Sequence, residues 1–453
     1  WAGCGETVRT SSVLERVRGT AAPLPRKHVS MNTPDQQHGT GGTTVTAAPA
    51  PAIAGESETE SRYWRQNLVV CLIGSFTTIV AMTLLLPFLP LYVEQLGVKE
   101  HAAIVQWSGV AYGATFFTAA LVAPLWGRLA DLYGRKLMLI RASLGMAVAM
   151  SLIGMATDVW QLVALRLAAG LLGGYASGST VLVATQTPKA RTGWALGTLS
   201  SGIMAGNLVG PLIGGGLPPL IGIRQTFWLA GGVIFLTFIA TSLFIKEERR
   251  PPKGKGAKVT GGWSAIPDKR PIIAMLATGL LLMLANMSIE PIITVYVAQL
   301  VSDASKVTIV SGVVMSAAAL GSILSASRLG KLADRVGHWN VIIAALAVSA
   351  LLLIPQAFVT EGWQLIGLRF LMGLALGGLL PCITSVIRHN VPDRVAGGIL
   401  GYSTSSQYAG QVVGPLAGGF IGGHFGMRAV FLATCVLLAL GSAYCWLARP
   451  RQS

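Results

Sequence analysis

Twelve long apolar stretches follow one another along the chain, and short polar connections separate them. A helix that crosses a membrane needs roughly 20 predominantly apolar residues, and a chain of 453 residues has room for about a dozen such helices with their loops. The stretches begin near Asn67, Ile104, Leu137, Gln161, Trp194, Thr226, Ile272, Val307, Trp339, Gln364, Gly397 and Arg428. The pattern therefore predicts an all-α membrane protein with 12 transmembrane helices and no sizeable soluble domain.

The composition excludes a soluble enzyme. Hydrophobic residues make up 52% of the chain and charged residues only 11%, whereas soluble domains carry roughly 25% charged residues. The mean hydropathy is +0.62. The 55 glycines fit the same interpretation, because small residues allow the backbones of membrane helices to approach closely.

The polar segments divide the chain into five parts. Residues 1–65 are rich in Gly, Ser, Thr, Pro and Ala, a composition typical of disorder. Residues 1–30 precede the first methionine, Met31, and are left out of the fold argument because the native protein need not contain them. A six-helix half is expected over 66–245, a central loop over 246–271, a second six-helix half over 272–448 and a tail over 449–453.

The basic residues indicate the topology. Of the 34 Lys and Arg residues, 7 lie in the N-terminal tail and 21 in the even-numbered connections and the C-terminal tail. Only four lie in the odd-numbered connections. Cytoplasmic loops carry this excess of positive charge, so both termini and the central loop are expected in the cytoplasm. The net charge of +16 therefore reports orientation, and we expect no nucleic-acid partner.

Neither a metal site nor a catalytic residue is expected. The five cysteines have no CxxC spacing, and the six histidines lie in tails or near helix ends. The sequence also lacks the G-x-x-x-x-G-K-[ST] pattern that cradles nucleotide phosphates. ATP-driven transport is thereby excluded, and no cofactor is expected.

An internal repeat covers most of the chain. Four motifs recur in the same order at an offset of 203 or 204 residues: Pro87–Leu96 as Pro291–Leu300, Gly127–Gly134 as Gly330–Gly337, Trp160–Gly170 as Trp363–Gly373, and Gly206–Gly215 as Gly410–Gly419. Six predicted helices separate the copies, so both halves enter the membrane in the same direction. This parallel repeat is typical of transporters in which two six-helix halves rock around a central site.

The repeated motifs carry a family resemblance. The loop Gly127–Lys136 resembles the signature between helices 2 and 3 of the major facilitator superfamily. The segment Gly206–Gly215 resembles the fifth-helix antiporter motif of its drug:proton antiporter-1 (DHA1) branch. The stretches Trp126–Asp131 and Gly193–Ser200 are similar to bacterial multidrug-resistance efflux proteins within that branch. The resemblance runs from about Tyr63 to Leu447.

The resemblance implies a secondary transporter of the cell (inner or plasma) membrane and not an enzyme. It would export drugs or other amphiphilic small molecules in exchange for protons by alternating access, as a monomer driven by the proton gradient. Multidrug efflux of this kind would confer antibiotic resistance. A dedicated exporter or facilitator of one metabolite has the same fold and stays open as an alternative, and a non-transporting membrane receptor or enzyme is the alternative from a different class.

The resemblance also assigns a conformational latch to the loop between helices 2 and 3. It would consist of Gly127, Asp131, Gly134 and Arg135, together with Asp334 and Arg335 in the second copy. Gly127 lets another helix approach, and Asp131 can accept hydrogen bonds from a helix N-terminus or a guanidinium group. Leu132 stands where an arginine is common in the family. Ordinary anchoring by cytoplasmic positive charge is the alternative.

Two charged residues are candidates for proton coupling. An arginine at membrane depth usually faces protein or a water-filled cavity, and the family implicates the equivalent of Arg166 in coupling. Both Arg166 and its repeat counterpart Arg369 could instead extend their side chains toward the interface. Glu290 is the only acidic residue well inside an apolar stretch, where desolvation favours its protonated form. A structural role for Glu290, or exposure to an outer vestibule, stays open.

The remaining candidates lie on helix 5 and around the expected cavity. Gly206, Gly210, Pro211, Gly214 and Gly215 form the antiporter motif, whose four-residue spacing gives a smooth helix face; general helix packing is the alternative. Helices 1, 4, 7 and 10 line the cavity in the superfamily. The expected lining residues are mostly apolar, which suits amphiphilic substrates: Phe76, Met82, Tyr175, Asn286, Met287 and Glu290.

Overall fold

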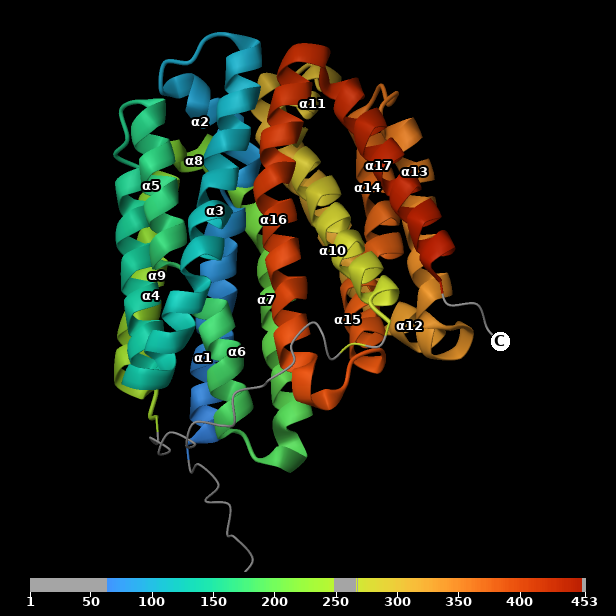
Figure 1. The fold of residues 1–453 in the computed structure, drawn as a ribbon. Helices are drawn as coiled ribbons and strands as arrows, with labels where there is room; N and C mark the ends of the chain where they lie inside the picture. The colour runs from blue at the N-terminus through green and yellow to red at the C-terminus, as the bar shows by residue number, and fades with distance from the viewer. Residues whose placement is uncertain (1–62, 248–265, 267, 450–453) are drawn as a thin grey trace, which may run out of the picture. The chain divides into compact units, whose positions relative to one another are not determined.

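The computed structural model describes residues 63–247, 266 and 268–449, all within the unit that runs from Thr59 to Ser453. The first half of this unit is helical throughout (Figure 1, blue to green). Its helices are α1 (Trp64–Thr83), η1 (Leu86–Phe88), α2 (Leu89–Gln95), α3 (His101–Tyr133), α4 (Arg135–Ile153), α5 (Val159–Leu172), α6 (Tyr175–Gln186), η2 (Lys189–Arg191), α7 (Thr192–Gly216), α8 (Pro218–Ile221) and α9 (Ile223–Phe244).

The second half repeats this order (Figure 1, yellow to red). Its helices are α10 (Arg270–Ile289), η4 (Glu290–Ile292), α11 (Ile293–Leu300), η5 (Ala304–Lys306), α12 (Val307–Val336), α13 (His338–Gln356), α14 (Gly362–Leu376), α15 (Leu379–His389), α16 (Asp393–Phe425) and α17 (Met427–Ala448). Within the described residues, 11 helical segments are long and apolar enough to cross a membrane. The twelfth predicted helix, from Gly397, coincides with the 33-residue α16. The predicted all-α fold class is confirmed.

Proline and glycine place the helix breaks at equivalent points of the two halves. Proline lacks a backbone N–H and cannot continue a helical ladder, and the first span breaks into η1 and α2 around Pro87 as the seventh breaks into η4 and α11 around Pro291. Positive φ angles recur at Gly134 (98°) and its repeat partner Gly337 (92°), where one span turns directly into the next. Glycine tolerates this conformation because it has no Cβ.

A tyrosine at the end of the first span anchors each half internally. Tyr92 is fully buried and its hydroxyl donates to the carbonyl oxygen of Ile153 at 2.5 Å. Tyr296, its repeat partner, donates to the carbonyl of Gln356 at 2.9 Å. Each bond ties the end of α2 or α11 to the end of α4 or α13, so the two halves use the same device at the same place.

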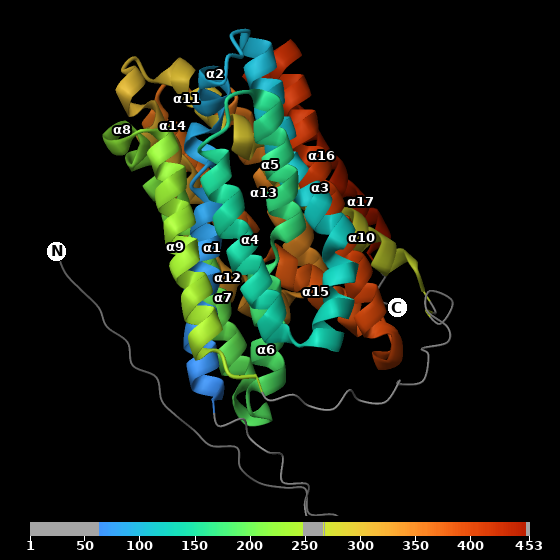
Figure 2. The ribbon, with the colours of Figure 1, turned by 90° about the vertical axis from the view of Figure 1, so that its left-hand side faces the viewer.

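The two halves meet along two pairs of helices. α3 packs against α16, and α7 packs against α12; α3 and α16 run side by side in both views (Figures 1 and 2). One large hydrophobic core spans both halves, and a smaller one surrounds Tyr175 on α6. The interface between the halves therefore positions the candidate site described next.

Candidate transport cavity and buried charged residues

At one end of the bundle, the helices of the two halves contact each other closely at glycine residues. A Cβ on Gly109 of α3 would collide with the carbonyl oxygen of Pro415 on α16. On the other interface, a Cβ on Gly312 of α12 would collide with the carbonyl of Pro211 on α7, and one on Gly215 would stand 2.6 Å from the carbonyl oxygen of Thr308. Backbones approach this closely only where side chains are absent. This end of the bundle is sealed by backbone contact.

Side-chain hydrogen bonds reinforce the same end. The Ser316 hydroxyl on α12 donates to the carbonyl of Leu208 on α7 at 2.7 Å. The Thr294 hydroxyl on α11 donates to the carbonyl of Pro87 in η1 at 3.0 Å. Both bonds join one half to the other, so separating the halves at this end would leave buried backbone carbonyls without these donors.

A cavity of about 610 Å³ lies between the halves. α1, α3, α4, α5 and α6 line it from the first half, and α16 lines it from the second. Its wall is largely apolar, with hydroxyl and amide groups at intervals; among the lining residues are Ile79, Met82, Phe116, Tyr175, Thr115, Gln407, Tyr408 and Gln411. A surface of this kind suits amphiphilic ligands, because apolar contact supplies area and a few polar groups fix orientation.

The predicted cavity residues are only partly brought together. Met82 and Tyr175 line this cavity. The other four predicted residues are half-buried and are not among its lining residues: Phe76, Asn286, Met287 and Glu290. Tyr175 is buried, and its hydroxyl shares a 2.8 Å hydrogen bond with Thr241 on α9. The contribution of α16 was not predicted, because amide and hydroxyl side chains on a glycine-rich helix carry no distinctive signal.

Arg166 on α5 is fully buried beside α3. Its Nε donates to the carbonyl oxygen of Ala111 at 3.2 Å, and its guanidinium carbon lies 5.7 Å from the centroid of the Tyr112 ring. Neither Nη atom has a hydrogen-bond partner in the described part of the chain. A fully buried guanidinium group with free donors is costly, so Arg166 is held in protein and does not extend to the interface.

Glu290 is the first residue of η4, at the break of the seventh span. It is half-buried, and its charge interacts with Arg369 on α14 and with Tyr112 on α3. Arg369 is 3% exposed, and its Nε and Nη2 lack hydrogen-bond partners among the described residues. Glu290 thus has Arg369 as its cationic partner, and its charge also acts on Tyr112, the tyrosine over whose ring Arg166 lies. The tyrosine was not predicted.

The predicted latch residues make contacts within their own half. Asp131 and Arg135 form an ion pair of 2.9 Å across one helical turn, with the Asp131 side chain 69% exposed. In the described part of the chain, no atom outside the adjoining helix backbone lies within 4 Å of where a Cβ on Gly127 would stand. In the second copy, Asp334 lies 3.6 Å from His338, one turn along, and Arg335 is exposed. The surface that Gly127 offers to another helix is vacant in this conformation.

Glu247, which the sequence did not single out, caps the helix after this loop. Its two carboxylate oxygens accept hydrogen bonds from the backbone N–H groups of Arg135 and Lys136, both at 2.8 Å. A carboxylate at a helix N-terminus satisfies free donors and complements the helix dipole. The sequence could have suggested a capping role only from the position of this acidic residue directly after the sixth apolar stretch. It could not identify the partners, which lie 111 and 112 positions earlier in the chain.

The antiporter motif faces two neighbours. Gly206, Gly210 and Gly214 contact α1 of the same half, where a Cβ would meet Ile79, Thr83 and Leu84 respectively. Pro211 and Gly215 contact α12 of the other half. The smooth face expected from the four-residue spacing therefore packs within the first half, and the adjoining positions form the seal between the halves.

Arg141 and Trp126 secure the break in the fourth span. The Arg141 guanidinium carbon lies 3.5 Å from the centroid of the Trp126 ring. Arg141 donates from Nη1 to the carbonyl of Leu172 at 2.9 Å, and Trp126 donates from Nε1 to the carbonyl of Leu171 at 2.9 Å. These donors satisfy the last carbonyls of α5 before Gly174 turns the chain into α6, beside the cavity that both side chains line. The sequence did not reveal this pair.

Two repeated six-helix halves, a cavity between them and a sealed end define a polytopic membrane transporter. The family model of the Major Facilitator Superfamily matches residues 71–362 and 309–453. The chain belongs to this superfamily, as the sequence motifs indicated, and is a multi-pass membrane transporter rather than an enzyme. Proteins of this family need no bound cofactor.

The chain is similar to bacterial multidrug resistance proteins. It is 42% identical over 406 residues to multidrug resistance protein MdtG of Serratia proteamaculans (strain 568), covering 89% of this chain and 97% of that protein. It is 44% identical over 384 residues to multidrug resistance protein MdtG of Salmonella typhimurium, covering 84% and 95%. The resemblance to efflux proteins of this kind is confirmed.

Solved structures share the fold at low sequence identity. A bacterial homolog of the human lysosomal transporter Spinster, in an inward-facing and occupied conformation, has a TM-score of 0.69 at 16% identity and covers 85% of this chain and 97% of its own. A mutant of the nucleoside transporter NupG has a TM-score of 0.65 at 12% identity, covering 84% and 100%. These likenesses establish the fold.

Proposed function

We propose that this protein exports drugs or other amphiphilic small molecules across the cell membrane in exchange for protons. The observation that carries the proposal is the largely apolar cavity of about 610 Å³ between the two halves, beside an interface sealed at one end. The similarity to multidrug resistance protein MdtG supports drugs as the substrate class. The protein would act as a monomer, because both halves of the transport path belong to one chain.

With the sealed end facing outward, as we propose, this conformation would be the one open to the cytoplasm. The positive-inside rule assigns the basic connections to the cytoplasm, and the described ones, such as those around Gly134 and Gly337, lie at the end opposite the glycine seal. In the outward-open conformation, the cytoplasmic ends of the halves would close, and the vacant surface at Gly127 would receive a helix of the second half. Asp131 and Arg135 would then exchange their contact along one helix for contacts across the interface.

Glu290 would carry the proton. It lies in η4, which contacts α3, η1 and α2 of the first half at the sealed end. With Glu290 ionised, its attraction to Arg369 joins the seventh and tenth spans of the second half; when Glu290 takes a proton, that attraction is lost and η4 can shift against the first-half helices that it contacts. Arg166 supports the same site from the first half through Tyr112. Proton binding is thereby linked to the contacts between the halves at the outer end.

The test is efflux of a panel of fluorescent and antibiotic compounds from pump-deficient cells, with and without a protonophore. Several unrelated compounds should leave the wild-type cells in a protonophore-sensitive manner. Efflux of a single compound would instead favour a dedicated metabolite exporter. No efflux of any compound despite confirmed membrane expression would refute the proposed substrate class.

The coupling role is tested by Glu290→Gln, with Glu94→Gln as the matched control. Glu94 is exposed at the end of α2, so the control removes the same charge outside the cluster. We expect Glu290→Gln to abolish proton-driven efflux while substrate counterflow in vesicles continues, and Glu94→Gln to behave as wild type. Unchanged proton-driven efflux in Glu290→Gln would exclude Glu290 as the carrier.

A further inference from the structure

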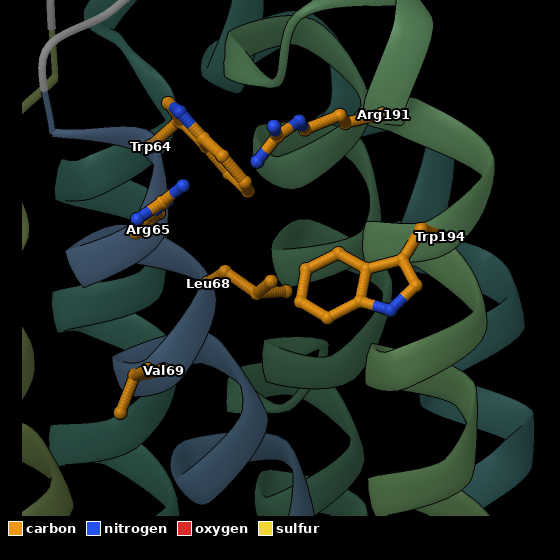
Figure 3. Close-up of a pocket in the computed structure, with 6 residues that line it drawn as sticks. All are labelled: Trp64, Arg65, Leu68, Val69, Arg191 and Trp194. Atoms are coloured by element: carbon orange, nitrogen blue, oxygen red, sulfur yellow. The ribbon is translucent and has the colours of Figure 1, made fainter.

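A groove of about 540 Å³ lies on the outside of the first half, where α1 and α7 begin. Figure 3 shows its lining as sticks: Trp64, Arg65, Leu68, Val69, Arg191 and Trp194. It is separate from the cavity between the halves, and none of these residues belongs to the proposed transport path. Among the described residues, two tryptophans, two arginines and two aliphatic residues line it.

The aromatic and cationic side chains are organised around Trp64. Its ring meets the ring of Trp194 edge to face, with centroids 6.4 Å apart and an interplanar angle of 88°. The guanidinium carbons of Arg65 and Arg191 lie 5.3 Å and 5.9 Å from the centroid of Trp64. Stacking on an aromatic ring orients a guanidinium group while its N–H donors stay available. None of the lining residues that the structure describes carries a carboxylate, and the two arginines make this described lining positively charged.

The groove lies at the ends of two membrane spans. Trp64 is the first residue of one span, and Arg191 lies in the first turn of another that begins at Lys189. Leu68 and Val69 follow one turn further into the first span, and Val69 is 53% exposed. Tryptophan gathers at the membrane–water interface, where its ring is amphipathic. The arginines therefore lie at the level of the lipid headgroups, and the aliphatic floor lies at the level of the acyl chains.

We propose that this groove binds an anionic phospholipid. The headgroup phosphate would accept hydrogen bonds from Arg65 and Arg191, because guanidinium groups match phosphate oxygens in pairs. The upper part of an acyl chain would lie along Leu68 and Val69 and against the ring of Trp194, which is 63% exposed. Charge complementarity selects an anion, and the apolar floor selects one that carries a hydrocarbon chain. A free phosphate ion would gain nothing from the floor.

The test is native mass spectrometry of the purified full-length protein titrated with phosphatidylglycerol or phosphatidylcholine. The test variant is Arg65→Gln/Arg191→Gln. The matched control is Lys269→Gln/Arg270→Gln, which removes two exposed positive charges at the start of α10, the repeat counterpart of α1, where no aromatic groove is formed in the described residues. Wild type should retain at least one phosphatidylglycerol in preference to phosphatidylcholine.

The preference should fall by roughly fivefold for each groove arginine removed, and the control should lose much less. Arg65→Lys/Arg191→Lys keeps both positive charges and should retain most of the preference for phosphatidylglycerol. The thermal unfolding temperature in neutral lipid should be the same in all variants, and this result would show that their folding is intact. Equal losses in test variant and control would overturn the site in favour of general surface charge. If millimolar inorganic phosphate displaced phosphatidylglycerol, a lipid would be overturned as the ligand of the groove. Undiminished phosphatidylglycerol binding by Arg65→Gln/Arg191→Gln would also overturn the proposal.

Discussion

Adding one methyl group at the seal between α7 and α12 tests directly whether the protein alternates between a sealed and an open conformation at this end. Gly215 and Gly216 are neighbours at the end of α7. A Cβ on Gly215 would stand 2.6 Å from the carbonyl oxygen of Thr308 and 3.2 Å from the Cα of Ile309. Beyond the adjoining helix backbone, no described atom lies within 4 Å of a Cβ on Gly216. We predict that Gly215→Ala opens this end of the bundle and that Gly216→Ala does not.

The magnitude follows from what the methyl group meets. Both colliding atoms belong to the backbone of α12, which cannot rotate away as a flexible side chain can, so the helices must separate. Forcing a methyl group into a packed site costs about 1–3 kcal/mol, which lowers the ratio of sealed to open molecules by about 5- to 150-fold. Replacing a helical glycine by alanine contributes a favourable 0.5–1 kcal/mol, roughly, to the helix itself. The Gly216→Ala control carries this propensity gain without the collision.

The assay is double electron–electron resonance between spin labels at Glu100 and Asp303. Both residues are exposed at the sealed end, one in each half, and the five native cysteines are first replaced by alanine. Wild type and Gly216→Ala should give the same short distance. Gly215→Ala should give a second, longer distance with a large share of the population.

Two results would refute the reasoning. An unchanged distance distribution in Gly215→Ala would mean that α7 and α12 accommodate the methyl group without a change in the free energy of the sealed conformation. Equal shifts in both variants would mean that helix propensity, and not the backbone contact, governs the equilibrium. A loss of folding in Gly215→Ala would be recognised from its gel-filtration profile, and Gly312→Ala, which meets the same interface from α12, would then be measured in its place.

Three further predictions concern the internal supports of the halves. Asn67→Leu removes the hydrogen bonds that its buried side chain makes with the backbone of Lys246, at 2.8 and 3.0 Å, and with the amide oxygen of Gln186, at 2.6 Å, and should lower the free energy of unfolding by about 1–3 kcal/mol in denaturant titrations; Asn67→Asp keeps one acceptor but loses the donor, and should not restore the stability. Tyr92→Phe removes the hydroxyl donor to the carbonyl of Ile153, which keeps only the backbone N–H of Ala156 at 3.2 Å, and should cost about 1 kcal/mol in the same titration, so an unaltered stability would show that the bond contributes nothing. Glu247→Gln weakens the N-terminal cap of α4 and should increase amide hydrogen exchange in the first turn of that helix, while exchange in α13, for which the described residues provide no such cap, stays constant.

Several features of this protein could be predicted because they depend on local pattern. Apolar stretches of spanning length determine transmembrane helices, since a backbone in lipid must satisfy its own hydrogen bonds. The repeat at 203 or 204 residues determined two similar halves, and its recurring Pro87 and Pro291 marked where the first and seventh spans break. The superfamily and the transporter class followed from the same motifs.

The tertiary structure decided which residues meet. A helix in a membrane is apolar on every side, so periodicity does not give its rotation about its own axis, and Met82 faces the cavity while Phe76, less than two turns away, does not line it. Glu290 interacts with Arg369 rather than directly with Arg166, and Glu247 caps α4 from the far end of the first half. These pairings join positions that are far apart in the chain, and only the packing of whole helices brings them together.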